Sequence, residues 1–353
     1  MKALRFHGQR DLRIEDVAPP GTPTADNVTV RVRYAGICGT DLHEYLSGPI
    51  FVSKTPHPMT GAALPVILGH EFSAVVEEVG PEVTEVAIGD RVAILPHLTK
   101  RTDFYARRNL GQFSPEVGLV GLSWHWGGMG EQVTLPQANL VRLPETVSDE
   151  QGALLEPSAV ALNAIDETGL RVGGTVLITG AGPIGALTAL AARAAGASRI
   201  YVHDPNTARL AHLSGFDDLR LFSGPPEEVL DAIAAETEAG VDAAIECAGQ
   251  ISAFDLCAEA LRHVGTLALV GLFGARQSVD LFQLCEKGIR LHGCLGNDST
   301  IGPRVAALIA SGDFPVETLV TGRIALKDAV AGGFEALAMP GTHHQKILIE
   351  MSA

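Results

Sequence analysis

A glycine-rich turn between an apolar run and an alanine-rich segment constrains this chain more than any other feature. The sequence Gly180-Ala-Gly182-Pro-Ile-Gly185 follows the apolar run Thr175–Thr179 and opens a helical pattern. Glycines at this spacing allow a tight turn and let a pyrophosphate approach backbone N–H groups at a helix amino terminus. The turn therefore predicts a dinucleotide-binding site. Its predicted cofactor-binding residues are Gly180, Gly182, Pro183, Ile184 and Gly185.

An acidic residue at the end of the next apolar run strengthens this prediction. Asp204 follows Ile200-Tyr-Val-His203, where a carboxylate accepts hydrogen bonds from the ribose hydroxyls of NAD and repels the 2′-phosphate of NADP. NAD is therefore the expected cofactor. Two alternatives stay open. Asp204 is also a candidate helix cap, because Pro205 follows it, and Arg209, counted here as a cofactor-binding residue, keeps NADP in consideration.

Short apolar runs alternate with helical patterns from about residue 158 to residue 293. Helices are expected around Pro183–Ala195, Pro226–Ala235 and Ser252–Arg262. The expected strands are Thr175–Thr179, Arg199–His203, Leu219–Phe222, Val241–Glu246, Thr266–Val270 and Ile289–Gly293. Six strands with intervening helices predict an α/β fold with a doubly wound, parallel, six-stranded Rossmann sheet.

The chain before about Arg142 has a different pattern of apolar and polar residues. Short alternating segments such as Val28–Val32, Ser73–Val79 and Arg91–Ile94 are separated by Gly and Pro turns, which is typical of antiparallel, β-rich structure. After about Thr300 the chain has one or two helical segments and a closing strand, Lys346–Ile349. We expect this tail to return to the β-rich domain.

Composition limits the classes of binding partner and the cellular compartment that we expect for this protein. A formal charge of -15, with Lys and Arg scattered along the chain, makes nucleic acid an unexpected partner. The apolar stretches, such as Ala186–Ala192, fall short of the roughly 20 residues that span a bilayer, so no membrane association is expected. The first residues enter a strand-like segment without a signal sequence, and a cytoplasmic location is expected. None of the five cysteines forms a Cys-x-x-Cys pair, so reduced thiols are expected, with the last four buried in the core.

Two short motifs in the β-rich part contain residue types that bind zinc. Gly36-Ile-Cys38-Gly-Thr40-Asp-Leu-His43 is followed by Gly69-His70-Glu71. With the dinucleotide motif after them, they resemble the signature of the zinc-containing medium-chain alcohol dehydrogenases over essentially the whole chain. Three further motifs make the likeness greatest to the butanediol and sorbitol dehydrogenases of that family: Asp41-Leu-His43-Glu-Tyr45, Gly48-Pro-Ile50 and Leu154-Leu-Glu156-Pro157.

The resemblance implies a GroES-like catalytic domain made from both chain ends, with a Rossmann domain inserted. We expect residues 1–157 and 296–353 to form the catalytic domain and residues 158–295 the NAD-binding domain. It also implies a homodimer or homotetramer.

A catalytic zinc ion takes about three protein ligands and keeps one position open, and thiolate, imidazole and carboxylate all suit it. Cys38 and His70 are the first two candidates. By resemblance, Glu156 stands where many relatives carry a second cysteine, and Glu71 is the acid beside the histidine. The sequence leaves the choice between these two carboxylates open.

Two further residues are candidates for proton transfer. Thr40 stands where the family places a hydroxyl that contacts the substrate oxygen, and by resemblance it relays a proton. His43 is a candidate to pass that proton toward the cofactor ribose and solvent, because imidazole titrates near neutral pH; an exposed turn residue is the alternative.

One stretch departs from the family pattern. Many relatives hold a second, structural zinc with four closely spaced cysteines, but residues 97–115 contain none. We therefore expect one catalytic zinc per chain and a lobe at residues 97–115 that is held by packing, either of Phe104, Tyr105 and Phe113 or against another subunit.

The dinucleotide and zinc-binding motifs predict an NAD-linked, zinc-dependent oxidoreductase, and the resemblance implies a secondary alcohol as its substrate, such as a short vicinal diol or α-hydroxyketone of the 2,3-butanediol or acetoin type. The alternatives are a sorbitol-like polyol or threonine-like amino-alcohol dehydrogenase, a zinc-free reductase of the same fold, and a non-catalytic protein that binds a dinucleotide.

Overall fold

The structure is a computed structural model that describes residues 1–339 and 341–351. The chain divides into two compact units. The first contains Met1–Glu156, Asp298–Ala310 and Val320–Ala353, and the second contains Pro157–Asn297 and Ser311–Leu319. The expected return at residue 296 therefore lies two residues before the observed one. The expectation also missed the short piece of the second unit that lies inside the tail.

The first unit is built mainly from strands, as the alternating segments predicted. Its seven-stranded sheet has the order β10-β6-β5-β3-β18-β17, with β9 paired to β3. A three-stranded sheet has the order β2-β1-β4, and β7 pairs with β8. The strands are β1 (Lys2–Gly8), β2 (Asp11–Asp16), β3 (Asn27–Gly36), β4 (Val66–Ile67), β5 (Phe72–Val79), β6 (Arg91–Ile94), β7 (His97–Leu98), β8 (Gly118–Leu119), β9 (Gln132–Pro136), β10 (Leu140–Arg142), β17 (Val320–Ala325) and β18 (Lys346–Glu350).

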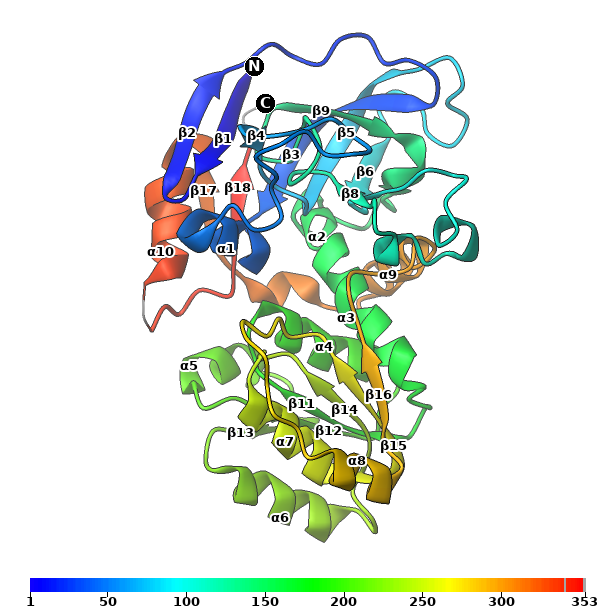
Figure 1. The fold of residues 1–353 in the computed structure, drawn as a ribbon, viewed down its shortest axis with the longest axis vertical. Coiled ribbons are helices and arrows are strands. Elements are labelled where there is room, and N and C mark those ends of the chain that lie inside the picture. Colours follow the sequence, from blue (N-terminus) through cyan, green and yellow to red (C-terminus); the bar gives the residue numbers. More distant parts are fainter. Residues whose placement is uncertain (340, 352–353) are drawn as a thin grey trace. The chain divides into compact units, whose positions relative to one another are not determined.

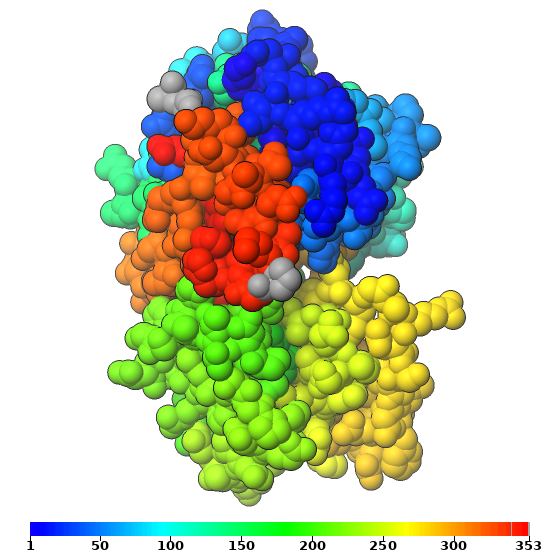
Figure 2. All heavy atoms as spheres, turned by 90° about the vertical axis from the view of Figure 1, so that its left-hand side faces the viewer, coloured from blue at the N-terminus to red at the C-terminus, as the bar shows by residue number. Residues whose placement is uncertain are grey.

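Both ends of the chain contribute to this unit. Strand β18 pairs with β3 in antiparallel fashion, with Leu348 opposite Gly36, so the last strand completes a sheet that the first part of the chain began. Figure 2 shows the carboxyl-terminal residues in orange and red beside the amino-terminal residues in blue. The helices are α1 (Gly39–Ser47), α2 (Asp149–Ala153), α9 (Gly302–Ser311) and α10 (Glu335–Ala338), with a π-helical turn at Ala329–Phe334.

The second unit contains a parallel six-stranded sheet in the order β13-β12-β11-β14-β15-β16, which confirms the predicted Rossmann fold. Helices α6, α7 and α8 lie together on one side of the sheet and α4 on the other (Figure 1). Its elements are α3 (Leu155–Thr168, whose first two residues belong to the first unit), β11 (Thr175–Thr179), α4 (Pro183–Ala194), β12 (Arg199–His203), α5 (Thr207–Leu210), β13 (Leu219–Phe222), α6 (Pro226–Glu236), β14 (Val241–Glu246), α7 (Ile251–Ala260), β15 (Leu261–Leu269), α8 (Leu281–Lys287) and β16 (Arg290–Gly293).

One predicted boundary was wrong. Helix α7 ends at Ala260, and Leu261 and Arg262, which were assigned to it, begin strand β15. The local pattern gave no warning, because Leu and Arg both suit a helix end. Pairing of Leu261 with Val241 of the neighbouring strand decides the boundary. Among the described residues, no helix is long and apolar enough to cross a membrane.

Candidate metal and cofactor sites

Strand pairing brings the two zinc-binding motifs together. Strands β3 and β5 are antiparallel, with Ala35 opposite Phe72. The residues just after one strand and just before the other therefore meet, and the Gly36 N–H donates to the Glu71 carbonyl oxygen at 2.8 Å. A Cβ atom on Gly36 would lie 2.4 Å from the Glu71 carboxylate. Glycine at this position leaves the room that the carboxylate occupies.

Cys38, His70 and Glu71 form a compact group of donors. One ligand atom from each lies within 4.8 Å of the other two. His70 is 6% exposed and Glu71 fully buried, so the donors converge inside the protein and not on a solvated acidic surface. Thiolate, imidazole and carboxylate at these separations match the donor set of a catalytic zinc site. The residues present therefore fit a zinc ion.

An unpredicted aspartate lies beside the histidine, in charge contact with it but without a hydrogen bond. Asp41 is fully buried; its Oδ2 accepts the Cys38 backbone N–H at 3.1 Å, and its Oδ1 lies 3.4 Å from Nδ1 of His70. Burial alone lowers the pKa of His70, but Asp41 and Cys38 outweigh it and raise that pKa well above its ordinary value. The surroundings of the ring thus favour positive charge. A carboxylate behind a ligand histidine is the usual arrangement at metal sites.

Lys346 is a second residue that sequence reasoning did not identify. Its side chain is 2% exposed, and its Nζ lies 2.5 Å from Oε2 of Glu71 and 3.3 Å from the Ile37 carbonyl oxygen. Burial lowers the pKa of Lys346, yet Glu71 and Cys38 more than offset this and raise it. The available signal was a lysine directly before the apolar residues 347–349 of strand β18, since a buried lysine requires a partner. Oε1 of Glu71 has no hydrogen-bond partner among the described residues.

The other candidate carboxylate lies outside this donor group. Glu156 is buried in the first turn of α3. Burial raises the pKa of Glu156 to about 7; His70 opposes the rise and Glu71 adds to it. Glu156 is thus within electrostatic reach of both residues, although its oxygens are not within 4.8 Å of all the other donors.

The two proton-transfer candidates share helix α1. Thr40 is partly buried and His43 is exposed. Residues three apart are neighbours on a helix surface. The helix thus places a hydroxyl and a solvent-exposed imidazole on one face, beginning directly after Cys38.

In the second unit, the glycine turn joins β11 to α4 as predicted. Gly180 has φ +88°, and a Cβ on Gly185 would lie 1.7 Å from the Gly180 carbonyl oxygen, so neither position accepts a side chain. A Cβ on Gly182 would meet no atom within 4 Å. Open space before the first turn of a twelve-residue helix suits the approach of a pyrophosphate. Pro183 is the first residue of that helix and Ile184 the second.

Asp204 lies where the sequence placed it, beside the glycine turn. It is 3% exposed; its Oδ2 accepts the Ala181 N–H at 2.7 Å and its Oδ1 accepts the Asn206 N–H at 2.8 Å. Asn206, and not Asp204, is the cap of α5, so the alternative role as helix cap is wrong. Nη1 of Arg209 lies 3.5 Å from Oδ2 of Asp204.

The lobe without cysteines is organised differently from the expectation. Phe104 is 55% and Phe113 40% exposed, so aromatic burial does not hold it together. The Asp103 carboxylate instead accepts hydrogen bonds from the Tyr105 and Ala106 N–H groups and from the Ser114 hydroxyl. Hydrogen bonds to one carboxylate therefore order this part of the lobe, and packing of the lobe against another subunit stays a prediction.

The cysteines outside the donor group are all free thiols, but they do not share one environment. Cys257 is buried, Cys247 and Cys294 are partly buried, and Cys285 is exposed on α8. The expectation of burial was therefore wrong for Cys285.

Two protein-family models match this chain, one mainly in each of the two units. The model of the alcohol dehydrogenase GroES-like domain matches residues 24–145, and that of the zinc-binding dehydrogenase matches residues 183–311. The chain is 36% identical to the (R,R)-butanediol dehydrogenase of Bacillus subtilis over 338 residues, 96% of each protein. It is 32% identical to human sorbitol dehydrogenase over 333 residues, 93% of this chain and 90% of the relative.

The crystal structure of 2R,3R-butanediol dehydrogenase from Bacillus subtilis matches the fold with a TM-score of 0.91 at 35% identity, covering 99% of both chains. The resemblance read from the zinc-binding motifs is confirmed. The chain is an oxidoreductase that acts on CH–OH groups with zinc and a nicotinamide dinucleotide, and it belongs to the zinc-dependent medium-chain alcohol dehydrogenase family.

Proposed function

We propose that this enzyme transfers hydride between NAD and the carbinol carbon of a short vicinal diol or α-hydroxyketone, such as 2,3-butanediol or acetoin. The compact donor group of Cys38, His70 and Glu71 carries the proposal, because a zinc ion held there would activate an alcohol oxygen. Similarity to butanediol dehydrogenases over nearly the whole chain supports the substrate class.

Cys38, His70 and Glu71 would hold the zinc ion. When bound, zinc supplies a Lewis acid that lowers the pKa of an alcohol oxygen. Oε1 of Glu71 supports its choice over Glu156, because this buried oxygen has no hydrogen-bond partner among the described residues and belongs to the compact donor group. Glu156 then remains a buried carboxyl beside the donors, able to hold a proton or accept a hydrogen bond. Asp41 lies in charge contact with the His70 ring, and Lys346 fixes the Glu71 carboxylate.

The proton released from the alcohol leaves through Thr40 and then His43. The partly buried hydroxyl and the exposed imidazole on one face of α1 support this route. Imidazole exchanges protons with solvent near neutral pH.

NAD is the proposed cofactor in preference to NADP. The Asp204 carboxylate stands beside the glycine turn, where it would repel a 2′-phosphate. Arg209 lies 3.5 Å from that carboxylate, so its charge is partly engaged by an acid. Pairing with Asp204 makes Arg209 a poorer receptor for a phosphate.

A polyol is the second candidate substrate, because human sorbitol dehydrogenase is 32% identical to this chain. A threonine-like amino alcohol is a further variant of the same reaction. A zinc-free reductase would not need the buried donor group, and a non-catalytic dinucleotide-binding protein would show no turnover.

The test combines metal analysis with a substrate panel. Purified protein, Cys38→Ala and His70→Ala are assayed with vicinal diols, acetoin-like ketones and polyols, with NAD and NADP in parallel. We expect one zinc per chain, highest activity with a short diol and NAD, and loss of both zinc and activity in the two variants. Cys285→Ala, which removes an exposed thiol, is the matched control. Full, chelator-insensitive activity in either site variant would contradict the proposal.

A cytoplasmic location and a homodimer or homotetramer remain predictions. The five free cysteines support a reducing compartment. Fractionation and light scattering test the two predictions separately.

A further inference from the structure

A pocket of about 560 Å³ opens in the second unit at the amino-terminal ends of the parallel strands. Its wall contains residues 168–174, which lead into β11, together with Asp242 at the start of β14 and Arg290 at the start of β16. Strand β15 contributes Arg262, Val264 and Thr266. The glycine turn follows the opposite, carboxyl end of β11, so this pocket is distinct from the predicted cofactor site.

Three arginines and one aspartate line the pocket: Arg171, Arg262, Arg290 and Asp242. Asp242 neutralises only one of them, since its Oδ1 accepts the Nε–H of Arg262 at 2.7 Å. The guanidinium groups of Arg171 and Arg290 make no ion pair or side-chain hydrogen bond with any residue in the described part of the chain. Two solvent-exposed positive charges without a protein partner therefore remain at this pocket, although the whole protein carries a formal charge of -15.

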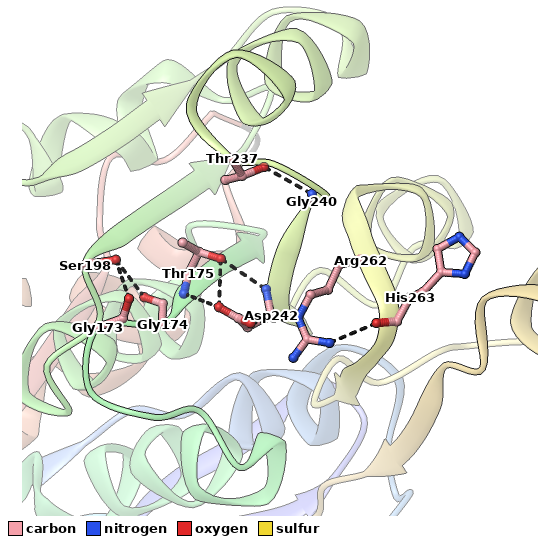
Figure 3. A network of polar contacts seen from close by, with 9 residues as sticks. All are labelled: Gly173, Gly174, Thr175, Ser198, Thr237, Gly240, Asp242, Arg262 and His263. Carbon is pink, nitrogen blue, oxygen red and sulfur yellow. Dashed lines mark hydrogen bonds and ion pairs between the residues drawn. The ribbon is translucent and has the colours of Figure 1, made fainter.

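Hydrogen bonds from two sides hold the Asp242 side chain of the pocket wall. Figure 3 shows the Asp242 side chain between Thr175 and Arg262. Its Oδ2 accepts the Thr175 N–H at 2.9 Å and the Thr175 hydroxyl at 3.1 Å. Partial burial raises the pKa of Asp242, but the bonds from Arg262 and Thr175 outweigh it and lower that pKa. The Ser198 hydroxyl closes the adjoining turn by donating to the Gly173 carbonyl oxygen at 2.6 Å (Figure 3).

A strained residue lies on the rim. Val264 has φ +60° and is 57% exposed. This conformation is an outlier for a β-branched side chain, and such strain gathers at ligand-binding positions. The neighbouring acid Glu167 is already paired, with its Oε2 3.1 Å from Nε2 of His292. It does not neutralise the free arginines.

We propose that this pocket binds a small polyvalent oxyanion of the phosphate or phosphate-ester class, held by Arg171 and Arg290 with Arg262 fixed as a third donor. Guanidinium groups bind phosphate oxygens through paired, charge-assisted hydrogen bonds. The volume lies within the 300–1,000 Å³ range that is usual for small-molecule sites.

The test is isothermal titration calorimetry with inorganic phosphate and pyrophosphate. Ionic strength is held constant with sodium chloride, and saturating NAD is present to occupy the dinucleotide site. We expect one pyrophosphate per chain, bound more tightly than phosphate. The double variant Arg171→Gln/Arg290→Gln should bind at least tenfold more weakly. The matched control Arg107→Gln/Lys327→Gln, which removes two exposed positive charges from the first unit, should bind like the parent protein.

Absence of pyrophosphate binding by the parent protein, or equal affinity in the arginine double variant, overturns the proposal. If the double variant does not fold, the single variants are used, each with an expected loss of threefold or more. NAD affinity is measured in the same samples without anions. Failure of NAD binding would count against the proposed function alone, because the arginine pocket and the glycine turn contain different residues.

Discussion

The buried ion pair between Lys346 and Glu71 offers a quantitative test of the metal site. Its atoms lie 2.5 Å apart and both side chains are at most 2% exposed. At an effective dielectric of about 20, Coulomb attraction at this distance is roughly 7 kcal/mol, and desolvation of the two charges offsets much of it. The net value of the pair is therefore smaller than the cost of removing one partner.

Lys346→Met leaves Glu71 buried without its cation. The carboxylate can avoid this by taking up a proton. For a glutamic acid with the ordinary value of about 4.3, protonation costs about 1.36 kcal/mol per pH unit above it, or about 4 kcal/mol at pH 7. Truncation of one partner of a buried pair generally costs about 3–5 kcal/mol. Both routes give a loss of about 4 kcal/mol for the zinc-free protein.

Urea unfolding of chelator-treated protein measures this loss. We expect the destabilisation by Lys346→Met to shrink to about 2 kcal/mol at pH 5.5, since protonation is then less costly. Lys346→Met/Glu71→Gln should be more stable than the single Lys346→Met variant at pH 7, because the carboxylate that lost its lysine partner is then replaced by a neutral amide. Equal stability of Lys346→Met and parent protein at pH 7, or a loss independent of pH, would refute this account of the site.

Three further predictions concern positions elsewhere in the fold. Burial, assisted by the neighbouring His70, lowers the pKa of His97 to about 4. The neutral ring therefore stabilises the fold above pH 6.5, and this contribution is lost as the pH falls toward 4. His97→Phe should reduce the acid-induced loss of stability by about 1–3 kcal/mol. Parallel urea-midpoint curves for variant and parent would argue against this. Val264→Gly should stabilise the protein by about 0.5–1 kcal/mol in urea unfolding, because glycine accepts the positive φ. The control Val172→Gly changes an exposed valine without positive φ and should not stabilise the protein. Equal effects of the two substitutions would rule out strain at Val264. The Glu44 carboxylate accepts hydrogen bonds from the N–H groups of residues 50–52. Glu44→Ala should therefore lower the free energy of unfolding by about 3 kcal/mol and expose this loop to proteolysis. Unchanged stability and unchanged cleavage would show that these bonds contribute little.

Local rules explain why much of the second unit was predictable. The turn from Gly180 to Gly185 requires glycine for reasons of backbone conformation and close approach, and its residues lie within one strand–turn–helix segment. Asp204 follows from the end of the next strand. Parallel strands buried on both faces produce apolar runs that can be recognised singly. Where two such elements adjoin without a turn, as at Arg262, the boundary was missed.

The sequence by itself determined the residue types of the metal site, the strand–turn–helix that suits a dinucleotide, and the division into a β-rich and an α/β part. Only the tertiary structure decided that Lys346 faces Glu71, a partner 275 residues away, and that Glu71, not Glu156, joins the compact donor group. The register of β3 with β5 and β18 also fixed which side chains meet. Local patterns report backbone preference and burial, but the partner of a buried charge depends on strand pairing between distant segments.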